Sequence, residues 1–299
     1  MNRILITGGT GLLGSNLALQ LRTNYEVYIL SNKKKIHIPR TKTNTSKQSV
    51  EHIFSSFNPN LVINAAAVTD IEFCENNPKY AVNTHVKFLE TIISNCIKCN
   101  CKLIHISTDH LSNGTKPMIK EEVDLMPLNH YAKTKLMSEQ LIQKEITNYL
   151  IIRTNFFGWG PKYRPSFSDR VIINLSENKE IYLFKDAFFS PVSIYNLVSV
   201  ILKLYQSNAS GIFNVSSNDR ISKLDFGILL SEFFKLNQNL IIPSSINNQK
   251  HLTIRPKDTS LDNTKVSKFL NYNCGTVSEN IKHLFIDIKN GVKDEIMRL

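Results

Sequence analysis

A glycine-rich turn near the start of the chain restricts the fold more than any other feature of the sequence. The apolar run Arg3–Thr7 leads directly into the motif Thr-Gly-Gly-Thr-Gly-Leu-Leu-Gly at positions 7–14, and apolar residues then recur at helical spacing over Leu12–Leu21. A strand, a turn with spaced glycines and a helix in this order form a unit that binds a dinucleotide pyrophosphate at the positive end of the helix. A turn that needs glycine only for its shape is the alternative, and the position between a strand and a helix argues against it.

Three glycines of this turn have separate roles in such a unit. We expect Gly8 to permit the tight turn, Gly11 to let a pyrophosphate approach the backbone, and Gly14 to let the helix pack closely on the strand. The residues expected to bind the cofactor here are Gly8, Thr10, Gly11, Leu12, Leu13 and Gly14.

The end of the second expected strand, Glu26–Leu30, indicates which dinucleotide binds. A site that prefers NAD usually places Asp or Glu here, where it holds the ribose hydroxyls. This chain instead has Ser31, Asn32 and Lys33, followed by two more lysines, and so lacks a carboxylate that would repel a 2′-phosphate. We expect these three residues to bind the cofactor and NADP(H) to be preferred, with NAD(H) as the alternative; a solvated basic loop is the competing interpretation.

Strands and helices alternate along the first half of the chain. The pattern predicts further strands at 61–64, 102–107 and 150–153, helices at 50–57, 79–95 and 130–144, and a loop at 31–45. Such alternation is typical of an α/β protein, here a Rossmann-type, doubly wound parallel sheet with helices on both faces.

The second half is less regular, and the pattern changes near residue 155 without a linker. We expect residues 1–155 to form the dinucleotide-binding domain, with 187–216 returning to it because that stretch contains an expected helix and strand. Residues 156–186 and 217–299 are expected to form a smaller α/β substrate-binding domain.

The composition excludes several classes of protein. Of 299 residues, 42% are hydrophobic and 20% charged, as in an ordinary globular protein. No apolar run approaches the ~18 residues that span a bilayer, and the first apolar run is too short for a secretory signal, so we expect a cytoplasmic protein without a membrane partner. The net charge of +11 comes from basic residues spread along the chain, which argues against a nucleic-acid partner and favours anionic small molecules.

The five cysteines are an odd number and cannot all pair within the chain. Cys96, Cys99 and Cys101 lie close together, but a structural zinc site usually takes four ligands in two separated pairs. We therefore expect reduced thiols and no metal site, with zinc as the alternative.

Candidate catalytic residues lie beyond the fourth expected strand. Tyr131 and Lys135 are four residues apart on an expected helix, so both side chains project from one face. Thr108 follows the strand at the carboxyl edge of the sheet, where folds of this class bind ligands. A phenol has a pKa of about 10, and a nearby ammonium brings it toward neutral pH. The three residues could therefore protonate an alkoxide as hydride arrives from a nicotinamide, although one such Tyr–Lys spacing is expected by chance in so lysine-rich a chain.

These residues, with segments farther along the chain, resemble the extended short-chain dehydrogenase/reductases, and most of all the dTDP-4-dehydrorhamnose reductase family. The resembling segments are 7–14, 62–67 (Val-Ile-Asn-Ala-Ala-Ala), 74–78 with Asn83, 106–109 (Ile-Ser-Thr-Asp), 131–136 (Tyr-Ala-Lys-Thr-Lys-Leu), 152–155, 190–192, 211–215 and 255–256. The resemblance implies that the three candidate residues are catalytic and that the cofactor site also includes Ala65, Ala66 and Asn83. It further implies an NADPH-dependent reductase that turns the keto group of a 4-keto-6-deoxy sugar nucleotide into a hydroxyl in deoxysugar and polysaccharide biosynthesis, and it is compatible with a homodimer.

Some positions depart from the family pattern. His110 stands where the family usually has tyrosine, and Phe156, preceded by Asn155, stands where it usually has tryptophan. Because these residues flank the expected sugar pocket, the sugar, the nucleotide and the stereochemistry stay open. Two other functions also stay open. One is a regulatory subunit, since the beta subunit of methionine adenosyltransferase resembles the same family, and the other is a nucleotide-sugar epimerase or dehydratase that uses the cofactor transiently.

Basic residues just beyond the last strand of the first half suit a nucleotide-sugar substrate. Lys162, Arg164 and Arg170 follow a segment that contains Phe156, Phe157 and Trp159. Cations beside aromatic faces fit the pyrophosphate and base of a nucleoside diphosphate, which we expect to bind here. Arg255 could face the same pyrophosphate or be an ordinary surface arginine.

Overall fold

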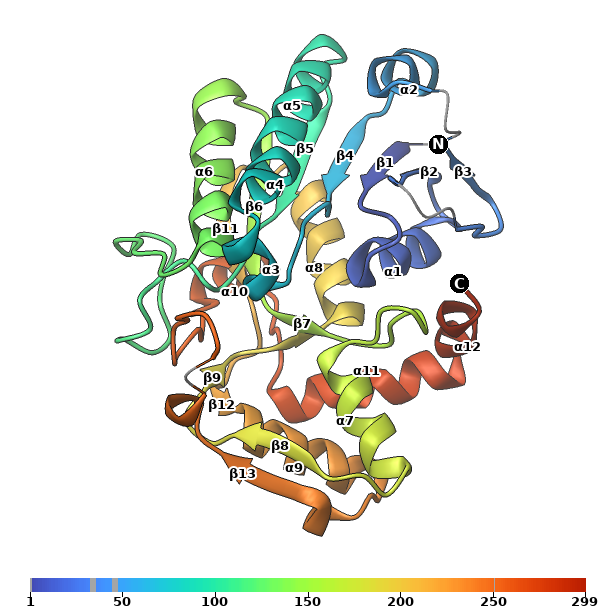
Figure 1. Ribbon diagram of the computed structural model, residues 1–299. Helices are drawn as coiled ribbons and strands as arrows, with labels where there is room; N and C mark the ends of the chain where they lie inside the picture. The colour runs from blue at the N-terminus through green and yellow to red at the C-terminus, as the bar shows by residue number, and fades with distance from the viewer. Residues whose placement is uncertain (1, 33–35, 45–47, 250) are drawn as a thin grey trace.

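The centre of the computed structural model, which describes residues 2–32, 36–44, 48–249 and 251–299, is a seven-stranded parallel sheet (Figure 1). Its strand order is β11-β6-β5-β4-β1-β2-β3, so β1 lies where the order reverses. In such a sheet ligands bind beyond the carboxyl ends of the strands at this point. The strands are β1 Arg3–Thr7, β2 Glu26–Leu30, β3 Thr41–Thr43, β4 Leu61–Asn64, β5 Lys102–Ile106, β6 Tyr149–Thr154 and β11 Gly211–Val215.

Helices cover both faces of the sheet. α1 and α8 pack on one face, and α2, α5 and α6 pack on the other (Figure 1). Successive strand residues point to opposite faces, so Ile4 and Ile6 belong to the first core and Leu5 to the second. Because both faces are buried, the inner strands are mostly apolar along their length, as the sequence indicates. The helices are α1 Leu12–Leu21, α2 Val50–Phe57, α5 Phe88–Lys98, α6 His130–Glu145 and α8 Ile194–Gln206.

Three stretches of the first half differ from the sequence pattern. The expected loop at 31–45 contains β3, an edge strand of three residues, too short and polar to give an alternating pattern. The helix expected at 79–95 runs longer, through α4 (Pro78–Val82), a π-helical turn (Asn83–Lys87) and α5. α3 (Ile71–Asn76) was not expected, because six residues are too few to show helical periodicity.

The second half adds a smaller layer below the carboxyl edge of the sheet (Figure 1). In it, α7 and α9 pack on each other and on the pair β8–β13, around an aromatic core in which the ring centroids of Phe157 and Phe189 lie 5.0 and 5.4 Å from that of Phe226. Short pairs β7–β10 and β9–β12 lie between the two layers. The bounds are β7 Phe156–Phe157, α7 Phe167–Ser176, β8 Ile181–Phe184, β9 Phe188–Phe189, β10 Val192–Ser193, β12 Ile221–Ser222, α9 Lys223–Phe234, η2 Gln238–Leu240, β13 Ile241–Ser244 and η3 Ile246–Asn248.

The last helices connect the two layers. α11 (Val277–Lys289) contacts both α8 and α9, α10 (Thr264–Leu270) packs on β11, and α12 (Val292–Met297) packs on α1. Of the stretch expected to return to the larger domain, β11 joins the main sheet and α8 covers it. Of the stretch expected in the smaller domain, α10 and α12 also contact the larger layer. Within the described residues, no helix combines the length and apolar character needed to cross a membrane.

Candidate active site

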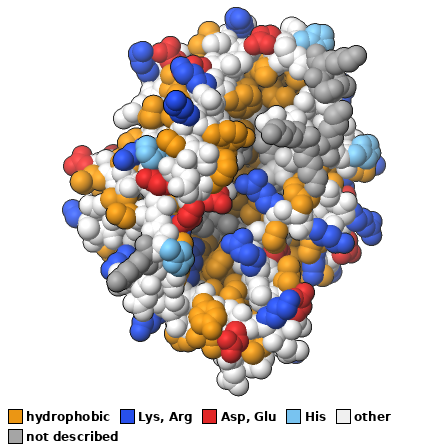
Figure 2. All heavy atoms as spheres, viewed as in Figure 1, with side chains coloured by type: hydrophobic (Ala, Val, Ile, Leu, Met, Phe, Trp, Pro, Cys, Tyr) orange, Lys and Arg blue, Asp and Glu red, His pale blue; other side chains and the backbone are white. Residues whose placement is uncertain are grey.

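A cleft of about 1120 Å³ lies along the carboxyl edge of the sheet. Loops that follow β1, β2, β4, β5 and β6 line it, together with residues 164–167 and Arg170. Figure 2 shows Lys and Arg side chains beside the hollow in the middle of this face. In the part of the chain that the structure describes, Asp109 is the only carboxylate that lines the cleft, whereas Lys135, Arg164 and Arg170 are basic. This balance favours an anionic ligand.

The glycine turn brings backbone close to the cleft. Gly8 has φ +67°, and a Cβ there would lie 2.6 Å from the carbonyl oxygen of Ala65. A Cβ at Gly14 would lie 2.3 Å from the carbonyl oxygen of Gly8, so Gly14 supports the turn rather than lining the cleft. Gly11 is the N-cap of α1, without a side-chain cap and without an acidic residue in the first turn. The first N–H groups of α1 are therefore available to an anion.

The end of β2 is held by a residue that the sequence did not single out. The side chain of Asn44 accepts a hydrogen bond from the Ser31 N–H (2.9 Å) and donates one to the Ser31 carbonyl oxygen (3.0 Å). Ser31, Asn32 and Asn44 all line the cleft, and none carries a negative charge. Lys33, which was also expected to bind the cofactor, lies outside the described residues.

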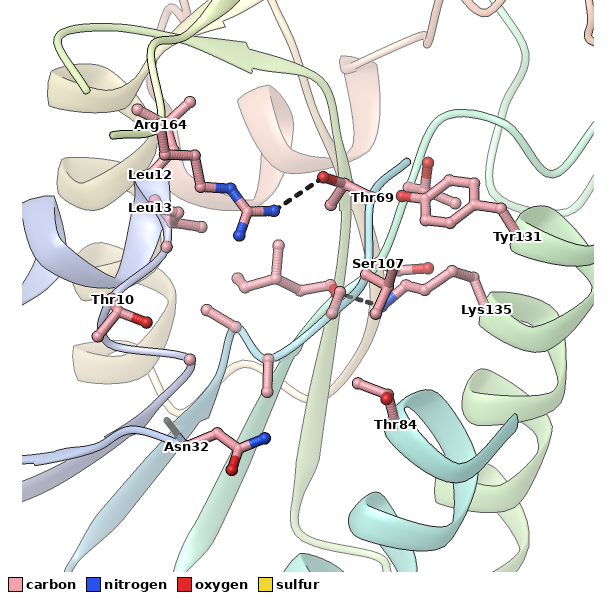
Figure 3. Close-up of a pocket in the computed structure, with 18 of the residues that line it drawn as sticks. Thr10, Leu12, Leu13, Asn32, Thr69, Thr84, Ser107, Tyr131, Lys135 and Arg164 are labelled. Atoms are coloured by element: carbon pink, nitrogen blue, oxygen red, sulfur yellow. Dashed lines mark hydrogen bonds between the residues drawn. The ribbon is translucent and has the colours of Figure 1, made fainter. Parts of the chain in front are cut away.

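Tyr131 and Lys135 project from α6 into the cleft, close to the end of β5 (Figure 3). Burial raises the pKa of Tyr131 well above its usual value, a hydrogen bond with the Thr108 side chain partly opposes this rise, and the Asp109 carboxylate adds to it. Burial lowers the pKa of Lys135 to about 8, although Glu139 acts in the opposite direction. The phenol therefore holds its proton at neutral pH, while the amine is close to its titration range.

Two histidines flank the ring of Tyr131. The rings of His85 and His110 meet it edge to face, with centroids 5.9 and 6.0 Å away. Burial, and to a smaller extent the charge of Lys135, lowers the pKa of His85 to about 3. Burial also lowers the pKa of His110, against the effect of Asp109. Both rings are therefore neutral groups that fix the orientation of the phenol.

A buried ion pair supports α6 from behind. Arg153 on β6 donates to both carboxylate oxygens of Glu139 on α6, with a shortest distance of 2.8 Å. The Ser107 hydroxyl donates to the same carboxylate (2.5 Å), and Arg153 also donates to the backbone of Glu121 (2.9 Å). The network ties α6 to β5 and β6, and so fixes the base of the site.

The basic residues expected to bind a nucleoside diphosphate lie in different places. The Arg164 side chain extends into the cleft and donates to the Thr69 hydroxyl (3.1 Å), as Figure 3 shows. The neighbouring Tyr163 hydroxyl donates to the carbonyl oxygen of Thr10 (2.9 Å). Arg170 also lines the cleft, whereas Lys162 is exposed and does not line it.

A second basic group stands near Arg170. Lys223 at the start of α9 has its Nζ 3.2 Å from the ring centroid of Phe189. Burial lowers the pKa of Lys223 to about 7, while Asp109 raises it and Arg170 lowers it. Arg255 is engaged in an ion pair with Glu72. Besides Lys135, the cleft is thus lined by Arg164 and Arg170, and Lys223 lies close enough to Arg170 to feel its charge.

The structure brings most of the expected site residues to one cleft. Those that line it are Gly8, Thr10, Gly11, Leu12, Leu13, Ser31, Asn32, Ala65, Ala66, Asn83, Thr108, Tyr131 and Lys135. Sequence reasoning missed Asn44, Gln48, Val68, Thr69, Tyr80, Thr84 and Phe88, which also line it. The only available signal was a polar residue in the loop after an expected strand, as Thr69 is in the loop that follows β4.

The cysteine cluster lies away from the cleft. Cys96 and Cys101 are buried free thiols that hydrogen-bond to each other, and Cys99 beside them is partly exposed. Among the described residues, no group of three His, Cys, Asp or Glu side chains is arranged to hold a metal ion.

Comparison with known proteins places the chain in a family. A family model described as the RmlD substrate binding domain matches residues 1–289. The spore coat polysaccharide biosynthesis protein SpsK of Bacillus subtilis is 32% identical, over 78% of this chain and 79% of that protein. The dTDP-4-dehydrorhamnose reductase of Aggregatibacter actinomycetemcomitans is 29% identical over 90% and 93%. The methionine adenosyltransferase 2 subunit beta of Xenopus tropicalis is 25% identical over 89% and 82%.

Solved structures have the same fold. The crystal structure of dTDP-4-dehydrorhamnose reductase from Bacillus anthracis in complex with NADP has a TM-score of 0.85 at 24% identity, and covers 96% of this chain and 100% of that chain.

Proposed function

The chain belongs to the RmlD substrate binding domain family, and on that premise we propose that it is an NADPH-dependent reductase of a 4-keto-6-deoxy sugar nucleotide. The observation that carries this proposal is that Thr108, Tyr131 and Lys135 line the same cleft as the glycine turn. Relatives named as a dTDP-4-dehydrorhamnose reductase and as a spore coat polysaccharide biosynthesis protein support the substrate class.

The residues present fit a dinucleotide phosphate. The turn has no space for a Cβ at Gly8 or Gly14, so it requires glycine at both positions. The uncapped start of α1 offers N–H groups to a pyrophosphate. The uncharged groups of Ser31, Asn32 and Asn44 accept a 2′-phosphate without repulsion. When bound, the reduced nicotinamide supplies the hydride for the carbonyl carbon.

The protein's own contribution to the reaction is a proton. Tyr131 is the proposed donor to the developing alkoxide, because its raised pKa keeps the phenol protonated until the reaction. The Thr108 hydroxyl, which hydrogen-bonds the phenol, is proposed to hold the substrate oxygen in line. Lys135 is proposed to bind the nicotinamide ribose and to adjust the pKa of the Tyr131 phenol.

The other end of the cleft suits the nucleoside diphosphate. We propose that Arg170 faces its pyrophosphate, with Phe167 as an aromatic neighbour, because both line the cleft. Lys223 supports this charge from behind Phe167, over whose ring its Nζ lies 4.9 Å from the centroid. The division at 1–155 with 187–216, against 156–186 with 217–299, stays a prediction, as do the homodimer and the cytoplasmic location.

A turnover assay tests the function. NADPH consumption is followed spectroscopically against 4-keto-6-deoxy sugars carried on dTDP, UDP, GDP and CDP. We expect turnover with one of them and a loss of about 10²–10⁴-fold in Tyr131→Phe, which removes a hydroxyl without changing the ring. NADPH affinity should stay the same in that variant. Near-normal turnover in Tyr131→Phe would remove the proposed acid.

The main alternative is a regulatory subunit, favoured by the similarity to the methionine adenosyltransferase beta subunit. Calorimetry on the NADPH-saturated protein separates the two functions. A reductase binds one nucleoside diphosphate at the Arg170 end of its cleft while NADPH is bound. If none binds and no substrate is turned over, the regulatory function takes precedence. An epimerase would turn over a sugar nucleotide without net loss of NADPH.

A further inference from the structure

Residues 160–166 form a short loop between β7 and α7 whose two ends meet at one carboxylate. Asp169 on α7 is 1% exposed, and its Oδ2 accepts from the N–H groups of both Gly160 and Ser166, each at 2.8 Å. Ser166 is also the N-cap of α7, and its hydroxyl accepts from the Asp169 N–H (3.0 Å). A single side chain thus holds both ends of the loop and the start of the helix.

The loop has little freedom between its two ends. Pro161 and Pro165 fix the backbone angle φ at about −65°, and the Arg164 N–H donates to the Pro161 carbonyl oxygen across the turn (2.7 Å). A Cβ on Gly160 would lie 2.5 Å from the Arg164 carbonyl oxygen, so the backbone packs on itself at this point. The side chains at the tip, Tyr163 and Arg164, therefore extend from a well-fixed backbone.

The tip is hydrogen-bonded to two loops from the first half of the chain. The Tyr163 hydroxyl donates to the carbonyl oxygen of Thr10 in the glycine turn (2.9 Å), and Arg164 donates to the Thr69 hydroxyl in the loop after β4 (3.1 Å; Figure 3). Thr10, Thr69 and Arg164 all line the cleft. Because residues 160–166 connect the second half of the chain to the first at the cleft, we call them the bridge.

The base of the bridge is held more firmly than its tip. The two hydrogen bonds to Asp169 are buried, whereas those from Tyr163 and Arg164 are exposed. An exposed hydrogen bond is replaced by one to water at little net cost, while a buried carboxylate that loses its donors pays the full cost of desolvation. The tip can therefore detach while the base stays in place.

The bridge lies beside the expected pyrophosphate site. A Cβ on Gly160 would lie 3.2 Å from Cδ1 of Leu12, the first residue of α1, whose N–H groups are available to an anion. The Arg164 guanidinium has five N–H donors, and among the described residues the Thr69 hydroxyl is the only side-chain acceptor that it contacts. Donors therefore remain for a phosphate while the bond to Thr69 is kept.

We propose that the bridge closes over the cofactor pyrophosphate, and that its tip detaches from Thr10 and Thr69 each time NADPH enters or leaves. Asp169 is then a positioning residue, because it acts through the loop that presents Tyr163 and Arg164. The bridge slows both association and dissociation, since the same two hydrogen bonds form in the free protein and over the bound cofactor. This inference rests on the cofactor of the proposed function and not on its sugar nucleotide.

Thr69→Val distinguishes a bridge from a simple contact with the cofactor. The substitution removes the acceptor for Arg164 but keeps the charge of the bridge, and Thr69 is exposed, so the variant should fold. Stopped-flow fluorescence of NADPH gives the association and dissociation rates in the absence of substrate. We expect both rates to rise by about 3- to 10-fold, the range for one hydrogen bond, with a smaller change in the dissociation constant. Tyr163→Phe, which removes the bond to Thr10, should show the same pattern.

Lys162→Ala is the matched control. Lys162 belongs to the same loop, but it is exposed and does not line the cleft, so both rates should stay close to those of the wild type. If Thr69 only contacted the cofactor, its loss would raise the dissociation rate alone. An unchanged association rate in Thr69→Val would therefore overturn the proposal. An unchanged dissociation rate would overturn it as well, because the bridge would then not close over the bound cofactor.

Two substitutions test the positioning role of Asp169. Asp169→Asn keeps an oxygen that accepts from Gly160 and Ser166, so its rates should stay near those of the wild type. Asp169→Leu releases both ends of the bridge and should raise both rates at least as much as Thr69→Val does. A purely structural role would lower the free energy of unfolding of Asp169→Leu without changing the rates, and that result would overturn the positioning role.

A measurement on the wild type keeps this test decisive if Asp169→Leu does not fold. The N–H groups of Gly160 and Ser166 should be protected in amide hydrogen exchange, because both donate to a buried carboxylate. Rapid exchange at either N–H would show that the base of the bridge is not held, and would overturn the role of Asp169. Since none of these measurements uses a sugar nucleotide, failure of the reductase assay would leave all of them interpretable.

Discussion

Replacement of Gly8 by alanine tests the role of the glycine turn, and Gly291 offers a matched control. Both glycines have a positive φ, +67° and +73°, but a Cβ at Gly291 would meet no atom within 4 Å, whereas a Cβ at Gly8 would lie 2.6 Å from the Ala65 carbonyl oxygen and 2.7 Å from Ala66 Cα. The left-handed backbone costs a non-glycine residue about 1–2 kcal/mol. Overpacking against backbone, which cannot rotate away, adds about 1–3 kcal/mol.

Gly291→Ala should therefore lose about 1–2 kcal/mol of unfolding free energy, and Gly8→Ala about 2–5 kcal/mol in total. The turn must also move in Gly8→Ala, which removes at least one N–H contact to the pyrophosphate and weakens NADPH by about 10- to 100-fold. Urea unfolding and fluorescence titration with NADPH measure the two effects. Equal stability losses in the two variants, or wild-type NADPH affinity in Gly8→Ala, would refute the reasoning.

Three further predictions concern single side chains. Ser31→Asp should reverse or narrow the preference for NADPH over NADH, as titration with each nucleotide would show, since a carboxylate repels a 2′-phosphate; tighter binding of NADH by the wild type would contradict the assignment. Arg164→Leu should weaken NADPH by about tenfold and leave the nucleoside diphosphate unaffected, while Arg170→Leu should do the reverse; calorimetry with each ligand decides, and the opposite pattern would exchange the two roles. Asp287 on α11 is 4% exposed, and burial raises its pKa to about 7. Because the unfolded carboxyl ionises near pH 4 and the folded one near pH 7, the free energy of unfolding of the wild type should fall by up to about 4 kcal/mol as the pH rises from 4 to 7. Urea unfolding at each pH should show that Asp287→Asn loses most of this fall.

The local features of the fold could be predicted because their causes lie within a few residues. The glycine turn, the alternating strands and helices, and the shared face of Tyr131 and Lys135 all depend on short spacings. β3 could not be predicted, because a strand of three polar residues is held by pairing with β2 rather than by its own pattern.

The rest of the site depends on contacts between distant segments. Asn44 belongs to the site only because β3 returns beside β2, and Arg164 only because the chain crosses the cleft to reach Thr69. His105 reads as one residue of a buried strand, and its place between Asn64 and Lys135 follows from the strand order. The one signal in the sequence is a polar residue within an apolar run, which does not identify its partners.

The central claim is that this chain carries out a net reduction of a sugar-nucleotide ketone. The most direct measurement uses NADPH deuterated at the transferred position, with mass spectrometry and NMR of the sugar product. We predict one deuterium at carbon 4 of the sugar for each NADPH oxidised, and a reduction of labelled product by about 10²-fold or more in Tyr131→Phe over the same time. Product formed without NADPH oxidation, or NADPH bound without any product, would contradict the account.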